Sequence, residues 1–266
     1  MTNQQSANPS LADLVSLKGR NGVITGAAQG IGAAIAHRLA EAGADLFLID
    51  RDGDQLQRGT RELAGFGGRV RLAVLDLTDS GALQAAADDA VVQLGGIDIW
   101  VNNAGISPRV GVLEMTDEQW DAVLDLNLRA AFIGARSAAR HMQAAGRGGI
   151  IVNMASSTVK RVSANPMHYR VSKQGLVAMT QSLAVELGRH GIRVVAIAPT
   201  LVETPWVAKL RACGYGEGFD KFVKRLPIGR IGTPDDVARV VLFAVSDLAS
   251  FVTGTMLEVD GGEGCA

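Results

Sequence analysis

The chain has 266 residues, of which 47% are hydrophobic and 20% are charged, and its formal net charge at pH 7 is -1. This length and composition allow a sizeable buried core, in one large α/β domain or in two small ones. The balanced charge argues against nucleic acid or an anionic membrane as the main partner, and Cys213 and Cys265 lack the spacing of a zinc site, so no metal is expected.

Residues 1–16 are predicted to form a flexible extension. They are polar and lack the long apolar region of a signal peptide. Later apolar runs are too short to span a bilayer, and two widely separated cysteines fit a reducing compartment. We therefore expect a cytoplasmic protein without a membrane partner.

From Arg20 onward, short apolar runs alternate with longer helical patterns, which indicates successive βαβ units on a parallel sheet. Strands are predicted at 21–25, 44–49, 70–75, 97–101, 150–154, 194–198 and 255–259. Helices are predicted at 31–42, 117–145, 166–187 and 234–247. Residues 200–232 mix Pro and Gly with weak periodicity, which predicts a mobile substrate lid with short helical turns. Because no stretch has the composition of a linker, residues 17–266 are predicted to form a single domain.

The turn after the first strand carries the pattern Gly26-x-x-x-Gly30-x-Gly32. Alone this is a modest signal, because glycines between a strand and a helix can be simple turn residues. Its place in a βαβ unit favours a loop that binds a pyrophosphate at a helix N-terminus. Asp50 ends the second strand, where a carboxylate meets the adenosine ribose and repels a 2′-phosphate, so NAD is expected over NADP. Arg51 could attract that phosphate, but Asp50 is given more weight.

Other polar residues end later strands or interrupt apolar faces. Asp76 follows the third strand and either contacts the adenine or caps a helix. The pair Asn102-Asn103 follows the fourth strand, and strand ends in open parallel sheets face the ligand crevice. Asn127 is the one strongly polar residue on an otherwise apolar helical stripe, and it is either functional or a satisfied core amide.

Tyr169 and Lys173 lie four residues apart, on one face of the helix predicted at 166–187. Leucines continue this face, so the two polar groups are predicted at the edge of a buried surface. An ammonium beside a phenol favours the phenolate, which predicts a Tyr169 pKa below its usual value of about 10. Tyr-x-x-x-Lys is common on helices by chance, but the leucines and the serines at 156–157 favour proton exchange with a substrate.

The opposite face of the same helix is also small or apolar. Its residues are Val171, Gly175, Ala178, Ser182 and Val185. A helix that faces solvent would be charged there. We therefore expect another subunit to cover this face.

With these motifs in one order and spacing, the chain resembles a single-domain short-chain dehydrogenase/reductase from about Leu17 to Gly262. The resemblance rests on Thr25-Gly26-Ala-Ala-Gln-Gly30-Ile31-Gly32, Asn102-Asn103-Ala104-Gly105, Asn127, Ser156, Tyr169-x-x-x-Lys173, Pro199 with Thr204, and Thr253-Gly254 to Asp260-Gly261-Gly262. It implies an α/β, Rossmann-like, doubly wound parallel sheet of about seven strands with helices on both faces. It also implies a homotetramer or homodimer, built in part on the helices at 117–145 and 166–187.

The resemblance further implies a nicotinamide cofactor and a catalytic set of Asn127, Ser156, Tyr169 and Lys173. Ser156 is favoured over Ser157 because it lies thirteen residues before Tyr169. The cofactor is expected to contact Gly26, Gln29, Gly30, Ile31, Gly32, Asp50, Arg51, Asp76, Leu77, Asn103, Ala104, Gly105, Tyr169, Lys173, Pro199, Thr200, Val202 and Thr204. The substrate pocket is expected to be bordered by Ser107, Arg109, Ser156, Lys160, Arg161, His168, Tyr169, Arg170, Trp206, Lys209, Lys221 and Lys224.

Two residues depart from the family pattern. Thr200 stands where Gly is usual, beside the expected nicotinamide, and Val159 stands where Gly or Ala is more common, so both should reshape the pocket. The implied chemistry has Tyr169 as acid or base, Lys173 on the ribose and Ser156 on the substrate oxygen. Asn127 is expected to position a water that carries protons from Lys173.

Three functions follow, and the leading one is an NAD-dependent sugar or polyol dehydrogenase. It would interconvert a hydrophilic secondary alcohol and a ketone, or a hemiacetal and a lactone, because the expected pocket border is polar and cationic. The alternative is a 3-oxoacyl-carrier-protein-type reductase, which Asp50 disfavours because biosynthetic reductions usually use NADPH. The third is a catalytically silent NAD-binding regulator or scaffold, which the intact Ser-Tyr-Lys set disfavours.

Overall fold

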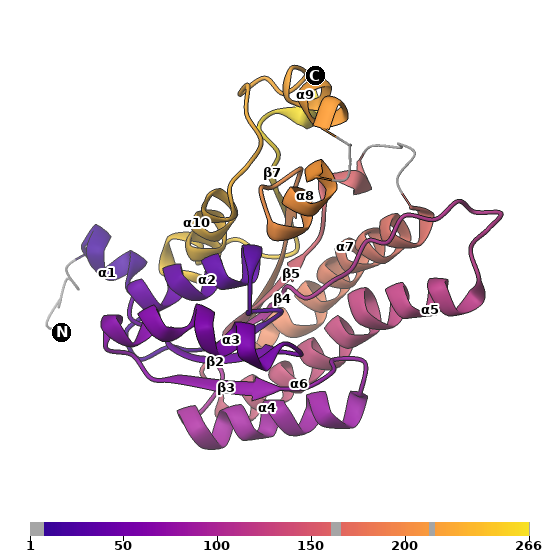
Figure 1. The fold of residues 1–266 in the computed structure, drawn as a ribbon. Helices are drawn as coiled ribbons and strands as arrows, with labels where there is room; N and C mark the ends of the chain where they lie inside the picture. Colours follow the sequence, from indigo (N-terminus) through magenta and orange to yellow (C-terminus); the bar gives the residue numbers. More distant parts are fainter. Residues whose placement is uncertain (1–7, 161–165, 213–215, 266) are drawn as a thin grey trace, which may run out of the picture.

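A parallel sheet forms the centre of the molecule (Figure 1). The computed structural model describes residues 8–160, 166–212 and 216–265, and within these residues the sheet has seven strands in the order β3-β2-β1-β4-β5-β6-β7. The strands are β1 (Asn21–Thr25), β2 (Asp45–Asp50), β3 (Val70–Val74), β4 (Ile99–Asn102), β5 (Gly149–Met154), β6 (Ile192–Pro199) and β7 (Met256–Val259). Strand order reverses between β1 and β4, and such a switch point opens a crevice at the carboxyl ends of the strands. The predicted fold class is confirmed.

Helices cover both faces of this sheet. The α-helices of the described residues are α1 (Leu11–Val15), α2 (Gly30–Glu41), α3 (Gly53–Gly59), α4 (Ser80–Leu94), α5 (Asp117–Leu124), α6 (Ala130–Ala145), α7 (Met167–Leu187), α8 (Pro205–Leu210), α9 (Gly216–Val223) and α10 (Pro234–Val245). Helices α2 and α10 pack on one face, while α4 and α6 pack on the other. Helix α1 lies inside the predicted N-terminal extension, where a capping box of Ser10 and Asp13 begins it.

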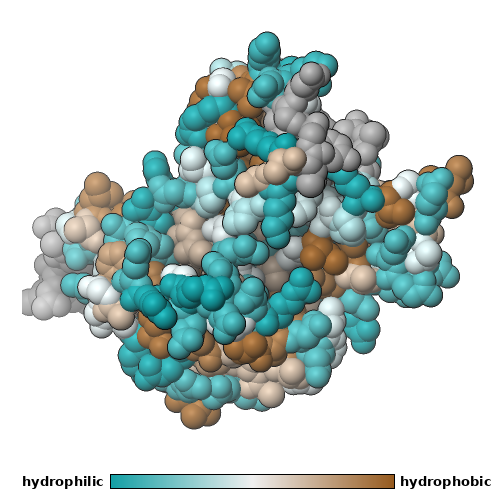
Figure 2. Space-filling view, viewed as in Figure 1, coloured by the Kyte–Doolittle hydropathy of each residue, from teal (hydrophilic) through white to brown (hydrophobic). Residues whose placement is uncertain are grey.

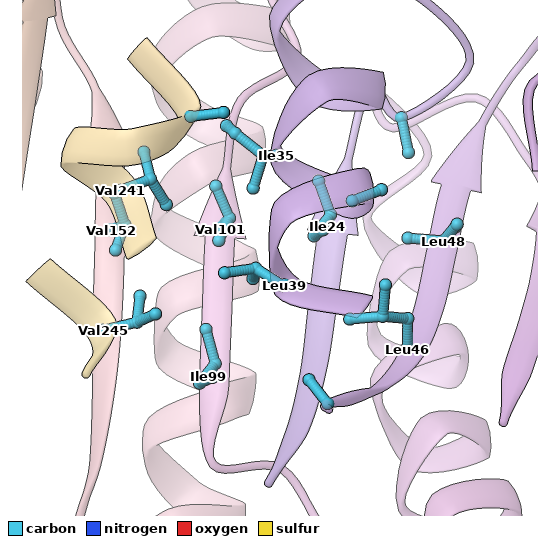
Figure 3. Close-up of a cluster of buried hydrophobic side chains, with 14 of the residues drawn as sticks. Ile24, Ile35, Leu39, Leu46, Leu48, Ile99, Val101, Val152, Val241 and Val245 are labelled. Atoms are coloured by element: carbon cyan, nitrogen blue, oxygen red, sulfur yellow. The ribbon is translucent and has the colours of Figure 1, made fainter. Parts of the chain in front are cut away.

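The core follows from the apolar strands. All five residues of β1 are buried, as expected for a strand with helices on both faces. Because successive side chains point to opposite faces, Ile24 packs under α2 and α10 while Val23 packs under α4 and α6. Figure 3 shows the first of these layers, in which Ile35 and Leu39 of α2 meet strand side chains and Val241 of α10.

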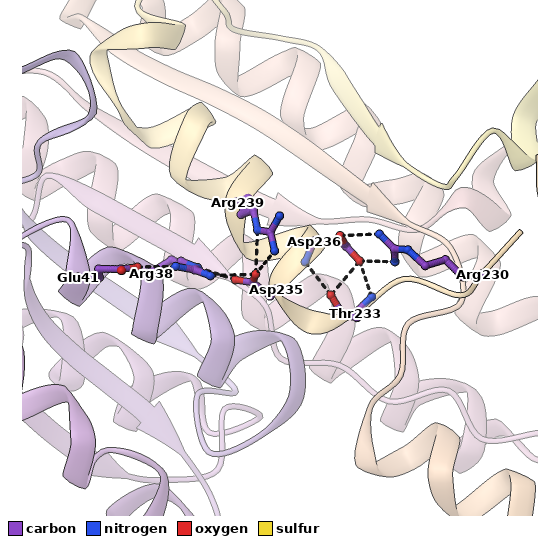
Figure 4. Close-up of polar contacts among 7 residues, drawn as sticks. All are labelled: Arg38, Glu41, Arg230, Thr233, Asp235, Asp236 and Arg239. Atoms are coloured by element: carbon purple, nitrogen blue, oxygen red, sulfur yellow. Dashed lines mark hydrogen bonds and ion pairs between the residues drawn. The ribbon is translucent and has the colours of Figure 1, made fainter. Parts of the chain in front are cut away.

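Two adjacent carboxylates at the start of α10 connect different parts of the fold (Figure 4). Asp235 accepts hydrogen bonds from Arg38 of α2, at 2.5 and 2.9 Å, and also pairs with Arg239. Asp236 accepts two hydrogen bonds from Arg230, at 2.7 and 3.0 Å, and completes a capping box with Thr233. One carboxylate therefore holds α10 to α2, and the other holds it to the segment that precedes it.

The predicted lid contains the two short helices α8 and α9, so its helical turns are confirmed, and its mobility stays a prediction. Its two ends meet in a parallel bridge between Val202 and Gly232, with Glu203 N–H donating to Gly232 O at 2.8 Å. Cys213 lies outside the described residues. Across the part of the chain that the structure describes, no helix has the length and apolar character needed to cross a membrane.

The predicted helix at 117–145 is helical throughout, but it is not a regular α-helix. It begins after Thr116, which forms a capping box with Gln119, and a π-helical turn at Asp125–Arg129 joins α5 to α6. Such turns often occur at functional sites. Asn127 stands in the middle of this one.

Candidate active site

A cavity of about 710 Å³ opens at the carboxyl ends of β1, β2, β4, β5 and β6. It is lined by Gly26, Gln29, Gly30, Ile31, Asp50, Arg51, Leu75, Asp76, Leu77, Asn103, Ala104, Gly105, Ile106, Ser107, Pro108, Leu126, Met154, Ala155, Ser156, Tyr169, Lys173, Pro199, Thr200, Thr204, Pro205 and Trp206. Of the residues predicted to contact a cofactor, all but Gly32 and Val202 line this cavity. Its position at the strand switch point is the expected place for a ligand in an open α/β sheet.

Glycine is required at three positions of the loop between β1 and α2. Gly26 and Gly30 have φ angles of 67° and 60°, in the left-handed region that other residues rarely adopt. Gly32 does not line the cavity, but a Cβ there would lie 2.0 Å from the carbonyl oxygen of Gly26. These glycines let the loop fold tightly and let α2 approach it closely.

The start of α2 fits a bound pyrophosphate. Its N-cap residue, Gln29, makes no side-chain hydrogen bond to the first turn of the helix. The Gln29 side chain therefore leaves the backbone N–H groups of that turn available to a ligand. Gln29, Gly30 and Ile31 all line the cavity. Free N–H groups and the positive end of the helix dipole make such a terminus suitable for phosphate groups. The residues present therefore fit the diphosphate part of a nicotinamide dinucleotide.

Two carboxylates mark the next part of the cavity. Asp50 accepts hydrogen bonds from Ala28 N–H at 3.0 Å and from Asp52 N–H at 3.1 Å, which fixes it beside the glycine loop. Each carboxylate oxygen keeps a further lone pair for a ligand hydroxyl. Asp76 accepts from the backbone and the hydroxyl of Thr78, and these hydrogen bonds lower the pKa of Asp76.

The side chains of Asn102 and Asn103, at the end of β4, form hydrogen bonds with other groups of the protein. Asn103 donates to the carbonyls of Thr25 and Gly26, both at 3.0 Å, so it holds the glycine loop against the end of β4. Asn102 accepts from Trp100 and donates to Asn153 Oδ1 at 2.9 Å inside the core. Only Asn103 reaches the cavity wall.

Ser156, Tyr169 and Lys173 come together at the cavity, as predicted. The Ser156 hydroxyl lies close enough to Tyr169 to lower the pKa of that phenol. Lys173 is 4% exposed, donates from Nζ to Met154 O at 2.7 Å, and lies 5.7 Å from the centre of the Tyr169 ring. An ammonium, a phenol and a serine hydroxyl thus share one part of the cavity wall, with Ser156 and Lys173 buried and Tyr169 half-buried.

Burial controls the protonation of this group. It raises the pKa of Tyr169 above its usual value, although the hydrogen bond with Ser156 acts in the opposite direction. Burial also lowers the pKa of Lys173 to about 8. Both shifts follow because a buried site disfavours the charged form of each group. The sequence prediction of a lowered Tyr169 pKa is therefore wrong, since it considered the neighbouring ammonium but not the loss of solvent.

Asn127 is buried and does not line the cavity. Its Oδ1 accepts from Ile106 N–H at 2.9 Å, and its Nδ2 donates to Ile106 O and Ser172 Oγ, both at 3.0 Å. The side chain therefore connects the segment after β4 to helix α7. Asn127 Oδ1 and Lys173 Nζ both flank Gly105, where a Cβ would lie 3.1 and 3.4 Å from them.

The expected substrate residues divide into two groups. Ser107, Ser156, Tyr169 and Trp206 line the cavity, whereas Arg109, Lys160, His168, Arg170, Lys209, Lys221 and Lys224 do not. Lys160 forms an ion pair with Glu258, and Arg170 donates to Thr158 O at 3.0 Å. His168 is fully buried, with Nδ1 accepting from Tyr169 N–H. Arg161 lies outside the described residues.

Of the predicted polar, cationic pocket border, the polar part is found, in Ser107, Ser156 and Tyr169, but the cationic part is wrong. Among the described residues, the only cations in the cavity lining are Arg51 and Lys173. Sequence reasoning missed seven lining residues, all of them apolar: Leu75, Ile106, Pro108, Leu126, Met154, Ala155 and Pro205. Most of them adjoin a predicted motif by one to three residues, so extending each motif would have found them.

Two further expectations concern the end of β6 and the turn after Ser156. Thr200 and Thr204 line the cavity, and Thr204 also caps α8 by accepting from Val207 N–H at 3.4 Å. The carbonyl of Val202 accepts a hydrogen bond from Thr204 N–H at 2.8 Å, in the turn that leads into α8. Val159 is buried but does not line the cavity, so its expected effect on pocket shape is not direct. Within the described residues, no cluster of three or more His, Cys, Asp or Glu is arranged to hold a metal ion.

Comparison with known proteins shows that the chain is similar to reductases and dehydrogenases. Residues 26–263 match a family model described as enoyl-(acyl carrier protein) reductase. The 3-oxoacyl-[acyl-carrier-protein] reductase FabG of Thermotoga maritima is 38% identical over 248 residues, covering 92% of this chain and 98% of that protein. The D-threitol dehydrogenase of Mycolicibacterium smegmatis is 37% identical over 246 residues, covering 92% of this chain and 93% of that protein.

A solved structure has the same fold and a related sequence. It is a Beutenbergia cavernae chain, proposed to be an NAD(P) dependent gluconate 5-dehydrogenase, with NADP bound at low occupancy. It matches with a TM-score of 0.89 and 38% identity over 95% of this chain and 100% of that chain. The names of these relatives agree on oxidoreduction and differ in substrate.

Proposed function

Because the chain belongs to the short-chain dehydrogenase/reductase family, we propose that it is an NAD-dependent oxidoreductase that interconverts a secondary alcohol and a ketone. One observation carries this proposal: Ser156, Tyr169 and Lys173 line the same cavity, where the Ser156 hydroxyl favours the ionised form of Tyr169. Enzymes of this family use a nicotinamide cofactor. When bound, it accepts hydride from the substrate carbon or donates hydride to it.

Tyr169 moves the proton in this proposal. In alcohol oxidation its phenolate oxygen takes the hydroxyl proton of the substrate, and in ketone reduction its phenol returns that proton. Ser156 hydrogen-bonds the same substrate oxygen and keeps it within reach of Tyr169. Their positions in the cavity wall orient the substrate for transfer.

Lys173 has donors for more than one partner. One N–H of Nζ donates to Met154 O. The other two N–H groups can donate to a ribose hydroxyl of the cofactor and to an acceptor beside Tyr169. With a pKa of about 8, Lys173 is mostly charged at neutral pH and favours the phenolate there. Asn127 Oδ1 flanks Gly105 together with Lys173 Nζ, which supports a role for Asn127 in passing protons from Lys173 toward solvent.

The preference for NAD rests on Asp50. Its carboxylate is fixed beside the glycine loop and lines the cavity, where it would accept from the ribose hydroxyls and repel a 2′-phosphate. Arg51 also lines the cavity, and a related structure holds NADP. Asp50 is given more weight because its oxygens are already positioned by two backbone N–H groups.

We expect a small, uncharged secondary alcohol as the substrate, with sugars and polyols as first candidates. The substrate end of the cavity combines the hydroxyls of Ser107 and Ser156 with apolar walls. Substrates that carry an acid group are disfavoured, because Lys160 and the lid lysines do not line the cavity and cannot pair with that group there. Similarity to D-threitol dehydrogenase supports a polyol, although a different alcohol would use the same proton chemistry.

A second candidate is reduction of a 3-oxoacyl group on a carrier protein. Similarity to the Thermotoga maritima FabG protein favours it. Asp50 disfavours it, because such reductions usually draw on NADPH. A catalytically silent regulator is disfavoured by the intact set of Ser156, Tyr169 and Lys173.

We also propose that the protein is a homotetramer or homodimer in the cytoplasm. On α7, Val185 is 87% exposed and Val171 is 41% exposed, and Phe132 of α6 is 43% exposed. A second copy that covers these side chains would remove apolar surface from water. The single exposed free cysteine of the described residues, Cys265, suits a reducing compartment.

A panel of sugars, polyols, cyclic alcohols and 3-oxoacyl thioesters, each with NAD and NADP, tests the function. The measurement is NAD(P)H absorbance. We expect turnover of an uncharged secondary alcohol with NAD. Turnover of the thioesters alone, with NADPH, would support the second candidate, and no turnover of any compound would contradict the assignment as an enzyme.

A further inference from the structure

A buried carboxylate near the C-terminus connects two segments that carry cavity residues. Glu263 is 9% exposed, and its Oε2 accepts hydrogen bonds from Ser157 Oγ at 2.8 Å and from Thr200 Oγ1 at 2.5 Å. Ser157 directly follows Ser156, and Thr200 itself lines the cavity. One oxygen of Glu263 therefore joins the turn that carries Ser156 to the end of β6.

The turn that presents Glu263 has a fixed shape. Asp260 accepts from Gly262 N–H at 3.0 Å and from Gly264 N–H at 2.7 Å, while Glu263 N–H donates to Asp260 O at 3.1 Å. Gly262 has a φ of 86°, and a Cβ there would lie 2.9 Å from Pro227. The Glu263 side chain therefore starts from a backbone position with little freedom.

The same turn contacts the lid. Ile228 N–H donates to Gly261 O at 3.2 Å, and a Cβ on Gly261 would lie 2.6 Å from the Ile228 side chain. Residues 260–264 thus touch three elements around the substrate end of the cavity: the turn after β5, the end of β6 and the lid. In Figure 1 the C-terminus lies at the same end of the molecule as the lid helices.

A buried carboxylate is unfavourable unless hydrogen bonds satisfy it. Here two hydroxyls do so, and each is thereby held in one orientation. Thr200 is branched at Cβ, so fixing its hydroxyl also fixes its methyl group. Its hydroxyl, being engaged with Glu263, is not free to turn toward a ligand.

We propose that Glu263 is a positioning residue that determines substrate specificity. It fixes the Thr200 side chain in the cavity wall and the turn that carries Ser156, and so sets which substituents beside the reacting carbon are accepted. This inference rests on the proposed alcohol and ketone activity at the same site. It adds a residue that is distant in sequence and does not itself line the cavity.

The test compares Glu263→Gln with Thr200→Val, which keeps the branched shape of Thr200 and removes its donor. The readout is kcat/KM for two alcohols that differ by one methyl group beside the carbinol carbon. We expect Glu263→Gln to lower kcat/KM about tenfold and to change the ratio between the two alcohols by about fivefold. Thr200→Val should change that ratio in the same direction, and the double variant should add little, because both substitutions break one hydrogen bond.

Glu258→Gln is the matched control. It is the same substitution five residues earlier, on β7, where Glu258 pairs with Lys160 away from the cavity lining. It should leave the ratio unchanged. In Glu263→Gln and Glu258→Gln the KM for NAD should stay within about twofold of the wild-type value, since neither residue lines the cavity. An unchanged ratio in Glu263→Gln, or fully additive effects of Glu263→Gln and Thr200→Val, would overturn the inference.

Hydrogen exchange separates failure of this inference from failure of the proposed function. If wild-type protein oxidises no alcohol, the amides of Val159 and Lys160, which donate to Ser156 O and Ser157 O, still report on the turn. They should exchange faster in Glu263→Gln than in Glu258→Gln, with β6 as an internal reference for global unfolding. Equal exchange in the two variants would contradict the positioning role whatever the activity is.

Discussion

The two ends of the cavity are built in different ways. The cofactor end consists of the glycine loop, Asp50, Asp76 and Asn103, each at the carboxyl end of a neighbouring strand. The substrate end combines the Ser156 turn, Thr200, the lid and the C-terminal turn that carries Glu263. The first follows mainly from strand order, with Asn103 and Asp50 bonded to the glycine loop, while the second depends on side chains that meet from distant parts of the chain. If the two ends are functionally separate, substitutions at one end should leave the properties of the other unchanged.

The largest effect is expected for Tyr169→Phe, at the boundary between the two ends. It removes the proton carrier, so turnover of the best alcohol should fall about 1000-fold. NADH binding, measured by fluorescence titration, should survive because the cofactor residues are unchanged. Turnover within tenfold of the wild-type rate would exclude Tyr169 as acid or base.

The pH dependence of alcohol oxidation should be steep. Burial raises the pKa of Tyr169, so the phenolate is a minor form that grows about tenfold per pH unit. We expect kcat/KM for oxidation to keep rising between pH 7 and pH 9, by less than the roughly 100-fold of an isolated phenol, because Lys173, with a pKa of about 8, loses its charge over this range. Ketone reduction, which uses the protonated phenol, should change little over this range and serves as the control. A plateau in oxidation below pH 9 would show that the charge of Lys173 outweighs burial.

Much of the cofactor end could be predicted from the sequence, and the reason is physical. A strand followed by a glycine turn, or by Asp50, fixes a residue at one edge of a parallel sheet, whatever the rest of the chain does. The Tyr169 and Lys173 pair could be predicted because helical spacing puts both on one face. The π-helical turn at Asn127 could not, since it depends on hydrogen bonds to Ile106 and Ser172 that form only in the folded protein.

The substrate end was predicted less well, because a charged residue near a motif need not point into a cavity. Lys160 pairs with Glu258, so its charge faces another part of the surface. Figure 2 illustrates the same difficulty for apolar residues, with hydrophobic side chains gathered at the projecting segment that leads into α5. Leu113 in that segment is 91% exposed, although its residue type suggests a buried position. Only the folded structure shows which of these side chains the cavity uses.

A smaller effect, confined to the cofactor end, is expected for Asp50→Ser. Removing the carboxylate relieves repulsion of a 2′-phosphate and leaves Arg51 to attract it. The ratio of kcat/KM for NADP to that for NAD should rise about tenfold, while the preference among alcohols stays the same. Asp52→Ser is the control, because Asp52 only caps α3 and serine can replace it there. A changed alcohol preference in Asp50→Ser would contradict the separation of the two ends.

The smallest effects concern the adjacent carboxylates of α10, of which one is bonded to helix α2 and the other to the lid. Asp235→Asn breaks the link to Arg38 of α2, and Asp236→Asn breaks the link to Arg230 at the base of the lid. Both side chains are partly exposed, so each change should lower the free energy of unfolding by only about 1 kcal/mol, a fall of roughly 2–4 °C in Tm. Only Asp236→Asn should also raise the KM for the alcohol, because only Arg230 belongs to the lid.

The pH dependence of the Asp235 effect follows from its pKa, which Arg38 lowers to about 2. A carboxylate with a lowered pKa in the folded protein stabilises it above the unfolded value of about 3.9, and this stabilisation is lost as the pH falls toward 2. Urea unfolding should therefore separate wild type from Asp235→Asn fully between pH 5 and pH 7, and progressively less below pH 4. If Asp235→Asn raised the KM for the alcohol as much as Asp236→Asn does, helix α10 would transmit changes from α2 to the lid, and the two ends of the cavity would act as one unit.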